Sequence, residues 1–239
     1  MKQRLDKLIA SNGMLSRREV HALVQKGRVT VNGSVVRAKD CKCDPDTDTI
    51  TIDGGRLDYC EKVYIMMNKP KGVLSASTDK NRRTVVDLAQ EAMGRRGLFA
   101  VGRLDKDTTG LLLLTDDGDF AHRIISPKSH VDKLYRATLD GAVTDAMIEA
   151  FARGITLADG TACLPARLVR STDSACVAEI TVQEGKYHQI KRMFGVVGLG
   201  VVELHRLRIG ALTLDATLQS GMCRKMTAQE IDAAQRISR

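Results

Sequence analysis

The stretch GRLDKDTTGLLLLT, residues 102–115, decides the fold of the larger part of the chain. Its second half contains four leucines in a row, a continuous apolar run typical of a strand that is buried on both faces of a sheet. Its first half is polar and charged and is flanked by Gly102 and Gly110. Because such a loop at the end of a buried strand opens onto a cleft, we expect a functional site around Asp105.

Further apolar runs lie on both sides of this stretch and alternate with helical patterns. The runs predict strands over 63–67, 98–101, 111–114, 134–139, 175–182 and 201–207. Helical spacing predicts helices over 84–93, 120–125, 144–152 and 188–197. The spacing is irregular rather than a repeated βαβ unit, so we predict an α+β fold with a mixed or antiparallel sheet flanked by helices.

The positive charge is concentrated at the N-terminus. The 239 residues carry a net charge of +8, yet residues 1–43 alone contain ten Lys and Arg residues and three acidic residues. The rest of the chain is nearly neutral. This asymmetry indicates a small nucleic-acid-binding module joined to a second domain.

The order of elements in this basic head is helix, helix, hairpin. Apolar residues at positions 5, 8 and 9 have helical spacing, and a short helix is expected to end near Gly13. The sequence SRRE at 16–19 is a capping box that begins a second helix ending at Gly27. Alternating valines then lead to Asn32-Gly33, which predicts a type I′ hairpin turn.

An acidic, turn-rich segment follows the basic head. Residues 44–62 contain the alternating sequence TITI at 49–52 and an Asp-Gly-Gly turn, which indicate a last hairpin followed by a linker. We therefore predict a boundary at residue 61, with a nucleic-acid-binding domain over 1–61 and a second domain over 62–239.

Arg17 and Arg18 lie in the first turn of the second helix, where positive charge opposes the helix dipole by about 0.3–1 kcal/mol each. Phosphate binding would compensate for this, so we expect both residues, together with Lys26 and Arg28, to contact RNA. The alternative is a pair of solvated surface arginines. The ordered sequences RLDKLIA, SRREV and VQKGRVTVNG resemble the S4 RNA-binding domain over residues 4–45.

The composition excludes several classes of protein. The apolar runs are far shorter than the roughly 18 residues of a membrane span, and the N-terminus lacks the features of a signal peptide, so we expect a cytoplasmic protein. Aromatic residues make up only 3% of the chain, which argues against a surface of stacking aromatics. The six cysteines lack the C-x-x-C spacing of a zinc or redox site, so we expect free thiols.

Other chemistries fit the sequence poorly. Asp105 and Asp107 resemble a glycosidase pair, but two residues apart in one loop they give no assurance of the separation that a sugar requires. The sequence DDGD at 116–119 lacks the further ligands of a calcium loop, and we expect Asp119 to cap a helix. No phosphate-binding or dinucleotide motif occurs, so nucleotide cofactors are not indicated, and no metal site is expected at 116–119.

The sequence EGKYHQIKRMF at 184–194 places several cations on a helix whose other face is apolar. In isolation it describes a solvated helix face, and we expect His188, like His205, to be structural or RNA-facing rather than a metal ligand. Together with residues 102–115 and KLYRATL at 133–139, however, it resembles the three ordered motifs of the RsuA-type pseudouridine synthases. With the S4-like head, the resemblance spans nearly the whole chain.

The resemblance implies an enzyme that breaks the N1–C1′ bond of a uridine in RNA and rejoins the base through C5. Asp105 matches the catalytic carboxylate, which acts as a nucleophile at C1′ or as a base toward the sugar. Tyr135 matches the tyrosine that packs against the target base, and Lys191 matches the cation that pairs with the carboxylate. Arg103 matches the arginine that helps displace the base from its stack.

The same resemblance implies a substrate. Gln189 and Arg192 are expected to contact RNA, and the redox-neutral reaction needs no cofactor. Residues 115–127 and 192–210 are closer to the enzymes of small-subunit rRNA than to their large-subunit relatives. We therefore expect a monomer acting on 16S rRNA, free or in a ribosomal assembly particle.

Three alternatives stay open at this point. They are the same reaction on 23S rRNA, a non-catalytic ribosome-assembly protein that binds RNA, and a small-molecule glycosidase or nucleosidase. The matching Asp105, Tyr135 and Lys191 argue against the second, and the basic head argues against the third.

Overall fold

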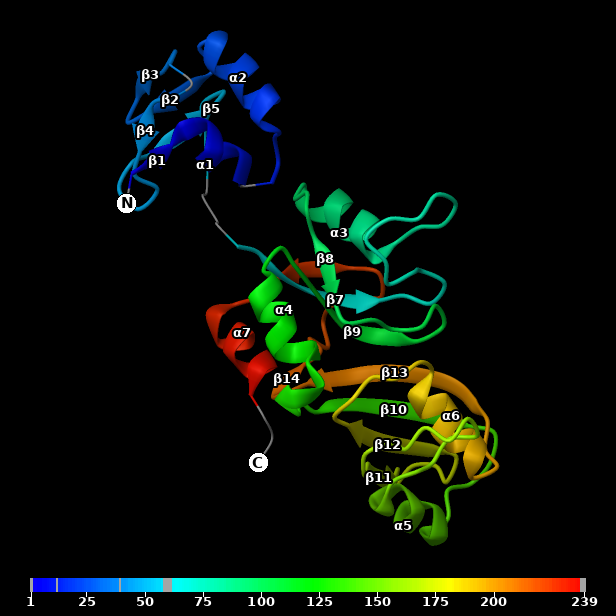
Figure 1. The fold of residues 1–239 in the computed structure, drawn as a ribbon. Coiled ribbons are helices and arrows are strands. Elements are labelled where there is room, and N and C mark those ends of the chain that lie inside the picture. The colour runs from blue at the N-terminus through cyan, green and yellow to red at the C-terminus, as the bar shows by residue number, and fades with distance from the viewer. Residues whose placement is uncertain (1, 12, 39, 58–61, 237–239) are drawn as a thin grey trace. The chain divides into compact units, whose positions relative to one another are not determined.

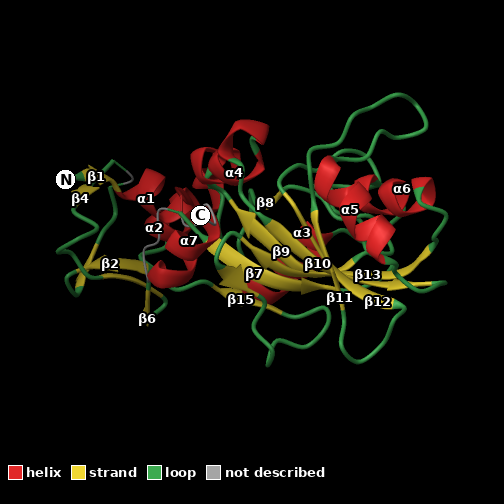
Figure 2. Cartoon of the chain, turned by 90° about the horizontal axis from the view of Figure 1, so that it is seen from below, coloured by secondary structure: helices red, strands yellow, loops and turns green. Residues whose placement is uncertain are grey.

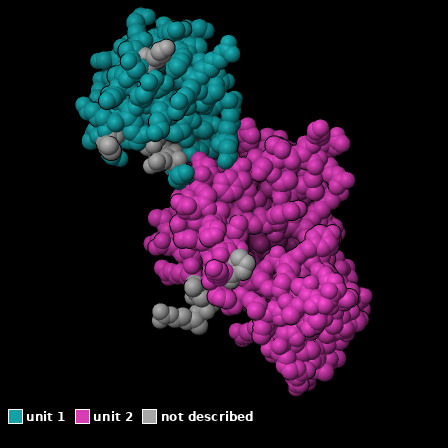
Figure 3. All heavy atoms as spheres, viewed as in Figure 1, with its two compact units in different colours: residues 1–63, 93–97 teal, residues 64–92, 98–239 magenta. Residues whose placement is uncertain are grey.

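The computed structural model describes residues 2–11, 13–38, 40–57 and 62–236. It divides into two compact units, one of Met1–Val63 with Met93–Gly97 and one of Tyr64–Ala92 with Leu98–Arg239 (Figures 1 and 3). The boundary predicted at residue 61 falls on residues 58–61, which lie outside the described residues.

The N-terminal unit has the predicted order of helix, helix and hairpin. Its helices are α1 (Leu5–Ser11) and α2 (Arg17–Gln25). A four-stranded antiparallel sheet has the order β3-β2-β5-β6, and β1 pairs with β4. The bounds are β1 (Gln3–Arg4), β2 (Val29–Val31), β3 (Ser34–Val35), β4 (Lys42–Cys43), β5 (Ile50–Ile52) and β6 (Gly55–Arg56).

Local sequence signals explain these boundaries. The Ser16 hydroxyl accepts a hydrogen bond from the Glu19 amide at 3.3 Å, and the Glu19 carboxylate accepts one from the Ser16 amide at 2.6 Å. This confirms the capping box at the start of α2. Asn32 and Gly33 have φ angles of 51° and 80°, which agrees with the predicted type I′ turn between β2 and β3.

A buried carboxylate joins the two helices of this unit. Asp6 is 2% exposed and accepts hydrogen bonds from the Arg4 guanidinium at 3.0 and 2.9 Å. Nε2 of the His21 ring in α2 lies 3.0 Å from Asp6 Oδ2. The Arg4 hydrogen bond holds the pKa of Asp6 well below its usual range. Asp6 is therefore an ionised group that links α1 to α2 beside the apolar core of the unit.

The second unit is built on one mixed sheet. Its strand order is β11-β12-β10-β13-β9-β7-β15, with β14 beside β13 and β8 beside β9. The pairing of β9 with β13 is parallel, and the other pairings are antiparallel, which confirms the predicted class. The bounds are β7 (Tyr64–Lys69), β8 (Phe99–Val101), β9 (Thr109–Thr115), β10 (Lys133–Leu139), β11 (Arg167–Arg170), β12 (Val177–Val182), β13 (Val201–Ile209), β14 (Leu212–Thr213) and β15 (Cys223–Lys225).

Helices cover this sheet. They are α3 (Val85–Met93), α4 (Gly118–Ile125), α5 (Asp145–Arg153), α6 (Gln189–Val196), α7 (Ala228–Gln235) and the 3₁₀ helix η1 (Pro127–Ser129). Figure 2 shows α5 and α6 on one face, where the rings of Phe151 and Phe194 lie 4.9 Å apart. Phe120 of α4 packs with Leu111 and Leu113 of β9 in a separate buried cluster. The four leucines of β9 are fully buried, as their pattern predicts.

Among the strands and α-helices of the second unit, four were not predicted, namely β11, β14, β15 and α7. Two of these strands contain only two and three residues, so they have no hydrophobic period to detect. The predicted cap of α4 was wrong by two residues: Asp117, not Asp119, caps this helix. The Asp117 side chain accepts hydrogen bonds from the amides of Asp119 and Phe120 at 3.0 and 3.2 Å.

Candidate active site

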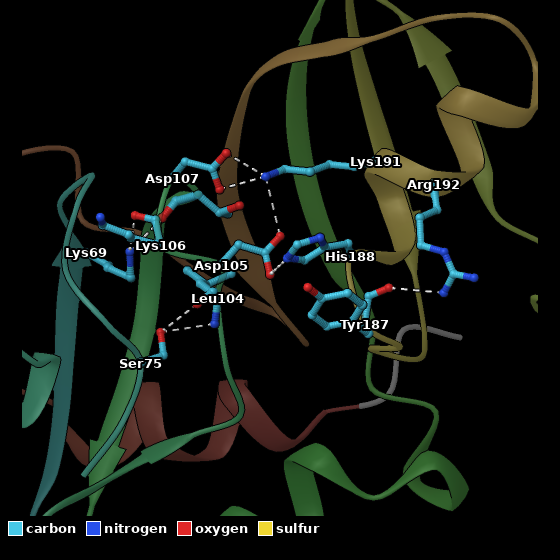
Figure 4. A network of polar contacts seen from close by, with 11 residues as sticks. Lys69, Ser75, Leu104, Asp105, Lys106, Asp107, Tyr187, His188, Lys191 and Arg192 are labelled. Carbon is cyan, nitrogen blue, oxygen red and sulfur yellow. Dashed lines mark hydrogen bonds and ion pairs between the residues drawn. The ribbon is translucent and has the colours of Figure 1, made fainter. Parts of the chain in front are cut away.

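The loop between β8 and β9 carries Asp105, and a buried serine holds the backbone just before it. The Ser75 hydroxyl donates to the carbonyl of Leu104 at 2.9 Å and accepts from its amide at 3.1 Å. Ser75 is 9% exposed, so water competes little for these bonds. Both backbone groups of Leu104 are therefore fixed, and the position of Asp105 with them (Figure 4).

A fully buried lysine supports the other side of this loop. The Lys69 ammonium donates to the carbonyls of Pro70, Lys106 and Thr108 at 3.0, 3.3 and 2.9 Å. Burial lowers the pKa of Lys69 to about 8. An ammonium has three donors, and here each of them bonds one carbonyl. Two of these carbonyls, those of Lys106 and Thr108, belong to the loop that carries Asp105.

Gly110 allows β9 to approach β13 closely at the end of the same loop. Its φ is +99°, and a Cβ there would lie 2.4 Å from the carbonyl oxygen of Arg206. A side chain at this position would therefore collide with backbone. The two strands pair in parallel here, with Arg206 opposite Gly110, so this glycine brings Arg206 beneath the loop.

Tyr135 lies on β10, directly opposite Arg206 of β13. Its phenolic oxygen accepts a hydrogen bond from Arg206 Nη1 at 3.2 Å, and Arg206 Nε donates to the carbonyl of Leu111 at 2.7 Å. The guanidinium carbon lies 5.8 Å from the centre of the Tyr135 ring. Tyr135 and Arg206 are 8% and 3% exposed, so a buried cation holds the tyrosine in place.

Lys191 reaches the loop from α6 and contacts two carboxylates. Its ammonium lies 2.6 and 2.7 Å from the Asp107 oxygens and 3.6 Å from Asp105 Oδ2. The Lys191 hydrogen bonds lower the pKa of Asp107. The structure thus brings Lys191 beside Asp105 as expected, but the closer partner of this lysine is Asp107.

A second nitrogen faces Asp105 from the start of α6. His188 Nε2 lies 3.5 Å from Asp105 Oδ1 (Figure 4). Both of the nitrogen contacts of Asp105 exceed hydrogen-bond length, and the Asp105 side chain is 27% exposed. Its oxygens therefore have a cationic environment while their lone pairs stay available to a reacting atom.

Several of these groups line one cavity of about 70 Å³. Asp105, Tyr135 and Lys191 all belong to its wall, together with Arg103, Thr108 and Gln189. The three residues assigned to catalysis come from a loop, a strand and a helix, and they converge on this space.

Arg103 lies at the mouth of the site. It is exposed, lines the cavity and forms no ion pair with another described residue. Its charge is therefore available to a ligand, as a residue that displaces a base from a stack would require.

Two other residues of the 184–194 motif are engaged within the protein. Gln189 is 5% exposed; it accepts from the Lys186 amide at 3.0 Å and donates to Glu184 Oε1 at 2.8 Å. Arg192 Nη2 lies 2.5 Å from Asp159 Oδ2. Gln189 still lines the cavity, but its amide also holds the segment before α6 in shape.

The basic residues of the N-terminal unit differ in the same way. Arg17, Arg18 and Lys26 are exposed and form no ion pair with the rest of the described chain. Arg28, in contrast, makes two hydrogen bonds of 2.5 Å to the Asp53 carboxylate. Among the RNA contacts predicted in this unit, Arg17, Arg18 and Lys26 are therefore the cations without an ion pair to another described residue.

Three residues that contact or support the site, His188, Lys69 and Arg206, were not assigned to it from the sequence. His188 belongs to the 184–194 motif that also contains Lys191, so the motif was the signal that could have placed it at the site. Lys69 and Arg206 gave no such signal, because a buried lysine or arginine is recognised only once the strands around it are assembled.

The structure adds three general observations. Among the described residues, no group of three or more His, Cys, Asp or Glu side chains is arranged to hold a metal. The described cysteines are free, and Cys60 lies outside them. None of the helices in the described part of the chain has the length and apolar character needed to cross a membrane.

Known families match both parts of the chain. Residues 63–195 match the family described as RNA pseudouridylate synthase, and residues 3–43 match the S4 domain. A Bacillus subtilis (strain 168) protein described as an uncharacterized RNA pseudouridine synthase, YtzG, is 45% identical over 95% of this chain and 96% of its own length. The ribosomal small subunit pseudouridine synthase A of Escherichia coli (strain K12) is 43% identical over 95% of this chain and 98% of its own.

A solved structure is similar over the same extent. A crystal structure described as a pseudouridylate synthase has a TM-score of 0.68 and 37% sequence identity, covering 97% of this chain and 99% of that chain. Sequence and structural similarity therefore extend over both units.

Proposed function

The chain belongs to the RNA pseudouridylate synthase family, and on this basis we propose that it converts one uridine of small-subunit ribosomal RNA to pseudouridine. The chain is accordingly an isomerase that acts on RNA. The observation that carries the proposal is the convergence of Asp105, Tyr135 and Lys191 on one cavity. The relative from Escherichia coli, named for the small ribosomal subunit, supports the choice of RNA.

Asp105 is the proposed catalytic carboxylate. Breaking the N1–C1′ bond develops positive charge at C1′, and a partly exposed carboxylate beside two nitrogens suits either a nucleophile there or a base toward the sugar. The base then turns, C5 bonds to C1′, the proton on C5 leaves to solvent, and N1 gains a proton. Atoms and electrons balance without a redox partner or a second substrate, so no cofactor is required.

The remaining residues have supporting roles in this proposal. Tyr135 packs against the extruded uracil, and the Lys191 ammonium supplies positive charge beside Asp105. Arg103 displaces the target base from its stack. Gln189 and Arg192 contribute to RNA contact at the motif before and within α6.

The N-terminal part is the proposed RNA-docking domain. We assign residues 1–61 to it and residues 62–239 to catalysis, with Arg17, Arg18, Lys26 and Arg28 contacting phosphates. The proposal extends to a monomer in the cytoplasm that acts on rRNA or on a ribosomal assembly particle. Action on large-subunit rRNA and RNA binding without catalysis are the competing functions.

The test is release of tritium from C5-labelled uridine in transcripts and assembly intermediates of each ribosomal subunit. Wild-type protein should release tritium from small-subunit RNA, and Asp105→Asn should lower the rate by at least about 1000-fold. Release only from large-subunit RNA would move the target to that subunit. No release from any of these substrates would disprove the enzymatic function.

A further inference from the structure

An exposed aromatic residue lies beside the candidate active site and has no role in the function proposed so far. Tyr187 is 76% exposed, in the segment between β12 and α6. Several large apolar side chains of the described residues are exposed, and among them Tyr187 alone is aromatic. In a chain with only 3% aromatic residues, an exposed tyrosine at a cavity indicates a binding role.

The ring of Tyr187 is held in a defined orientation. It stacks on His188 with ring centres 3.9 Å apart and an angle of 18° between the planes (Figure 4). His188 has a φ of 48°, in the left-handed region that residues other than glycine rarely occupy. Arg192 donates to the carbonyl of Tyr187 at 3.4 Å. An unusual backbone conformation therefore presents one face of the tyrosine to His188 and leaves the other to solvent.

This ring borders a second cavity of about 500 Å³ that adjoins the first. Asp105, Arg103 and His188 line both cavities. His188 connects the two spaces, because its ring stacks on Tyr187 and its Nε2 lies 3.5 Å from Asp105. The His188 ring thus lies between Tyr187 and the proposed catalytic carboxylate of Asp105.

Charge around the second cavity favours a nucleotide. Arg103 and Lys106 are exposed, and neither side chain forms an ion pair with another described residue. An aromatic face next to free cations is the combination by which proteins bind single-stranded RNA, since the ring stacks on a base and the cations meet phosphates.

We propose that Tyr187 is a stacking platform for the base of a nucleotide adjacent to the target uridine, with its phosphate near Arg103 and Lys106. The inference rests on the function proposed above and adds a second nucleotide site to it. Stacking on Tyr187 would keep the neighbouring base separate while the target enters the cavity at Asp105, and this offsets part of the cost of unstacking.

The chain contains no tryptophan, so Tyr187→Trp creates a single fluorescent reporter at the platform. The matched control is Val169→Trp on β11. Leu168, Ile180 and Tyr135 are cross-strand neighbours, so the next residue, Val169, points to the opposite face of the sheet. Val169 is also 43% exposed.

Each reporter is titrated with a small-subunit rRNA transcript and with inorganic polyphosphate. We expect the transcript to quench the fluorescence of Trp at 187 but not at 169, and polyphosphate to quench neither. Equal quenching of both reporters, no quenching at 187, or equal quenching by polyphosphate would each overturn base stacking. If a protein rather than RNA binds this ring, the transcript leaves the reporter at 187 unchanged.

Affinity gives a second measurement. Tyr187→Ala should raise the Kd for the transcript by roughly 5- to 100-fold, whereas Tyr187→Phe, which keeps the ring, should stay within about threefold of wild type. Because Tyr187 is largely exposed, neither change should disturb folding, which circular dichroism checks. Tritium release by wild-type protein reports the proposed function separately. An active wild type with an unaffected Tyr187→Ala would reject only the platform.

Discussion

Lys191 binds Asp107 more closely than it binds Asp105, with its ammonium 2.6 Å from the nearest Asp107 oxygen and 3.6 Å from Asp105 Oδ2. Both carboxylates belong to one short loop, and the lysine comes from α6. Asp107 is the more exposed of the two, at 56% against 27%. Asp107 therefore orients the lysine, and the longer contact leaves Asp105 available to substrate.

Changes at Lys191 and Asp107 should reduce activity to different extents. Lys191→Met removes the ammonium from beside Asp105 and should lower kcat by about 100-fold, because opposite charges about 4 Å apart near a protein surface attract each other by up to about 4 kcal/mol. Asp107→Asn keeps the ammonium but loosens it, and should lower kcat by about tenfold. Tritium release from labelled rRNA measures both.

Asp173→Asn is the matched control, since this aspartate is exposed and its side chain accepts a hydrogen bond from Thr172 at 3.2 Å. Its kcat should equal that of wild type. A larger loss in Asp107→Asn than in Lys191→Met would show that Asp107, not Lys191, is the group that matters for Asp105.

Two buried lysines should make the stability of the protein rise with pH. Burial lowers the pKa of Lys69 and of Lys133 to about 8, whereas an unfolded lysine keeps its proton to about pH 10.4. Between these pH values the unfolded chain binds more protons than the native one, so the free energy of unfolding increases with pH.

Lys133→Met isolates one of these contributions. The Lys133 ammonium donates to the carbonyl of Val131 at 2.9 Å and is buried, so the variant removes one buried group whose proton binding differs between the native and unfolded states. The difference in unfolding free energy between wild type and variant should grow by roughly 2 kcal/mol from pH 8 to pH 10. Urea denaturation at several pH values measures this difference.

Subtracting the unfolding free energy of the variant from that of wild type cancels the contribution of the buried thiols, because both proteins contain them. Burial raises the pKa of Cys43 to about 11, which lowers stability as pH rises above about 8.5 in both proteins. A difference that stayed constant from pH 8 to pH 10 would mean that Lys133 titrates alike in the native and unfolded states.

The free arginines of α2 should determine how strongly RNA binding depends on salt. Replacing Arg17 and Arg18 with Glu should weaken binding to rRNA and reduce the slope of log K against log salt by roughly 1.5 or more, because two phosphate contacts are lost. Helix α2 should remain folded, since acidic residues in a first turn favour the helix dipole. Affinity measured at four salt concentrations gives the slope.

The control is the same charge reversal at Arg153 and Arg170. Both are exposed and already pair with carboxylates, Arg153 with Glu149 at 3.6 Å and Arg170 with Asp145 at 2.5 Å. Their reversal should change the slope less. An unchanged affinity and slope in the Arg17 and Arg18 variant would remove α2 from the RNA interface.

Local pattern was sufficient to predict most of the fold. The strand β9 was predicted from four leucines, and α2 from a capping box whose two hydrogen bonds are present. Such signals depend only on residues that are close in the chain, so they can be recognised in the sequence without the tertiary structure. The missed elements β14 and β15 contain too few residues for a period, and they form because longer strands present edges to pair with.

The sequence by itself determined the order of most elements, a sheet that is mixed or antiparallel, the family and the three residues that converge on the cavity. Only the tertiary structure decided which groups hold these residues. Tyr135 contacts the buried guanidinium of Arg206 because strands far apart in the chain pair in one register. The Lys191 ammonium lies 3.6 − 2.6 = 1.0 Å closer to Asp107 than to Asp105. Contacts of this kind depend on distances across the fold, and residue spacing along the chain carries no information about them.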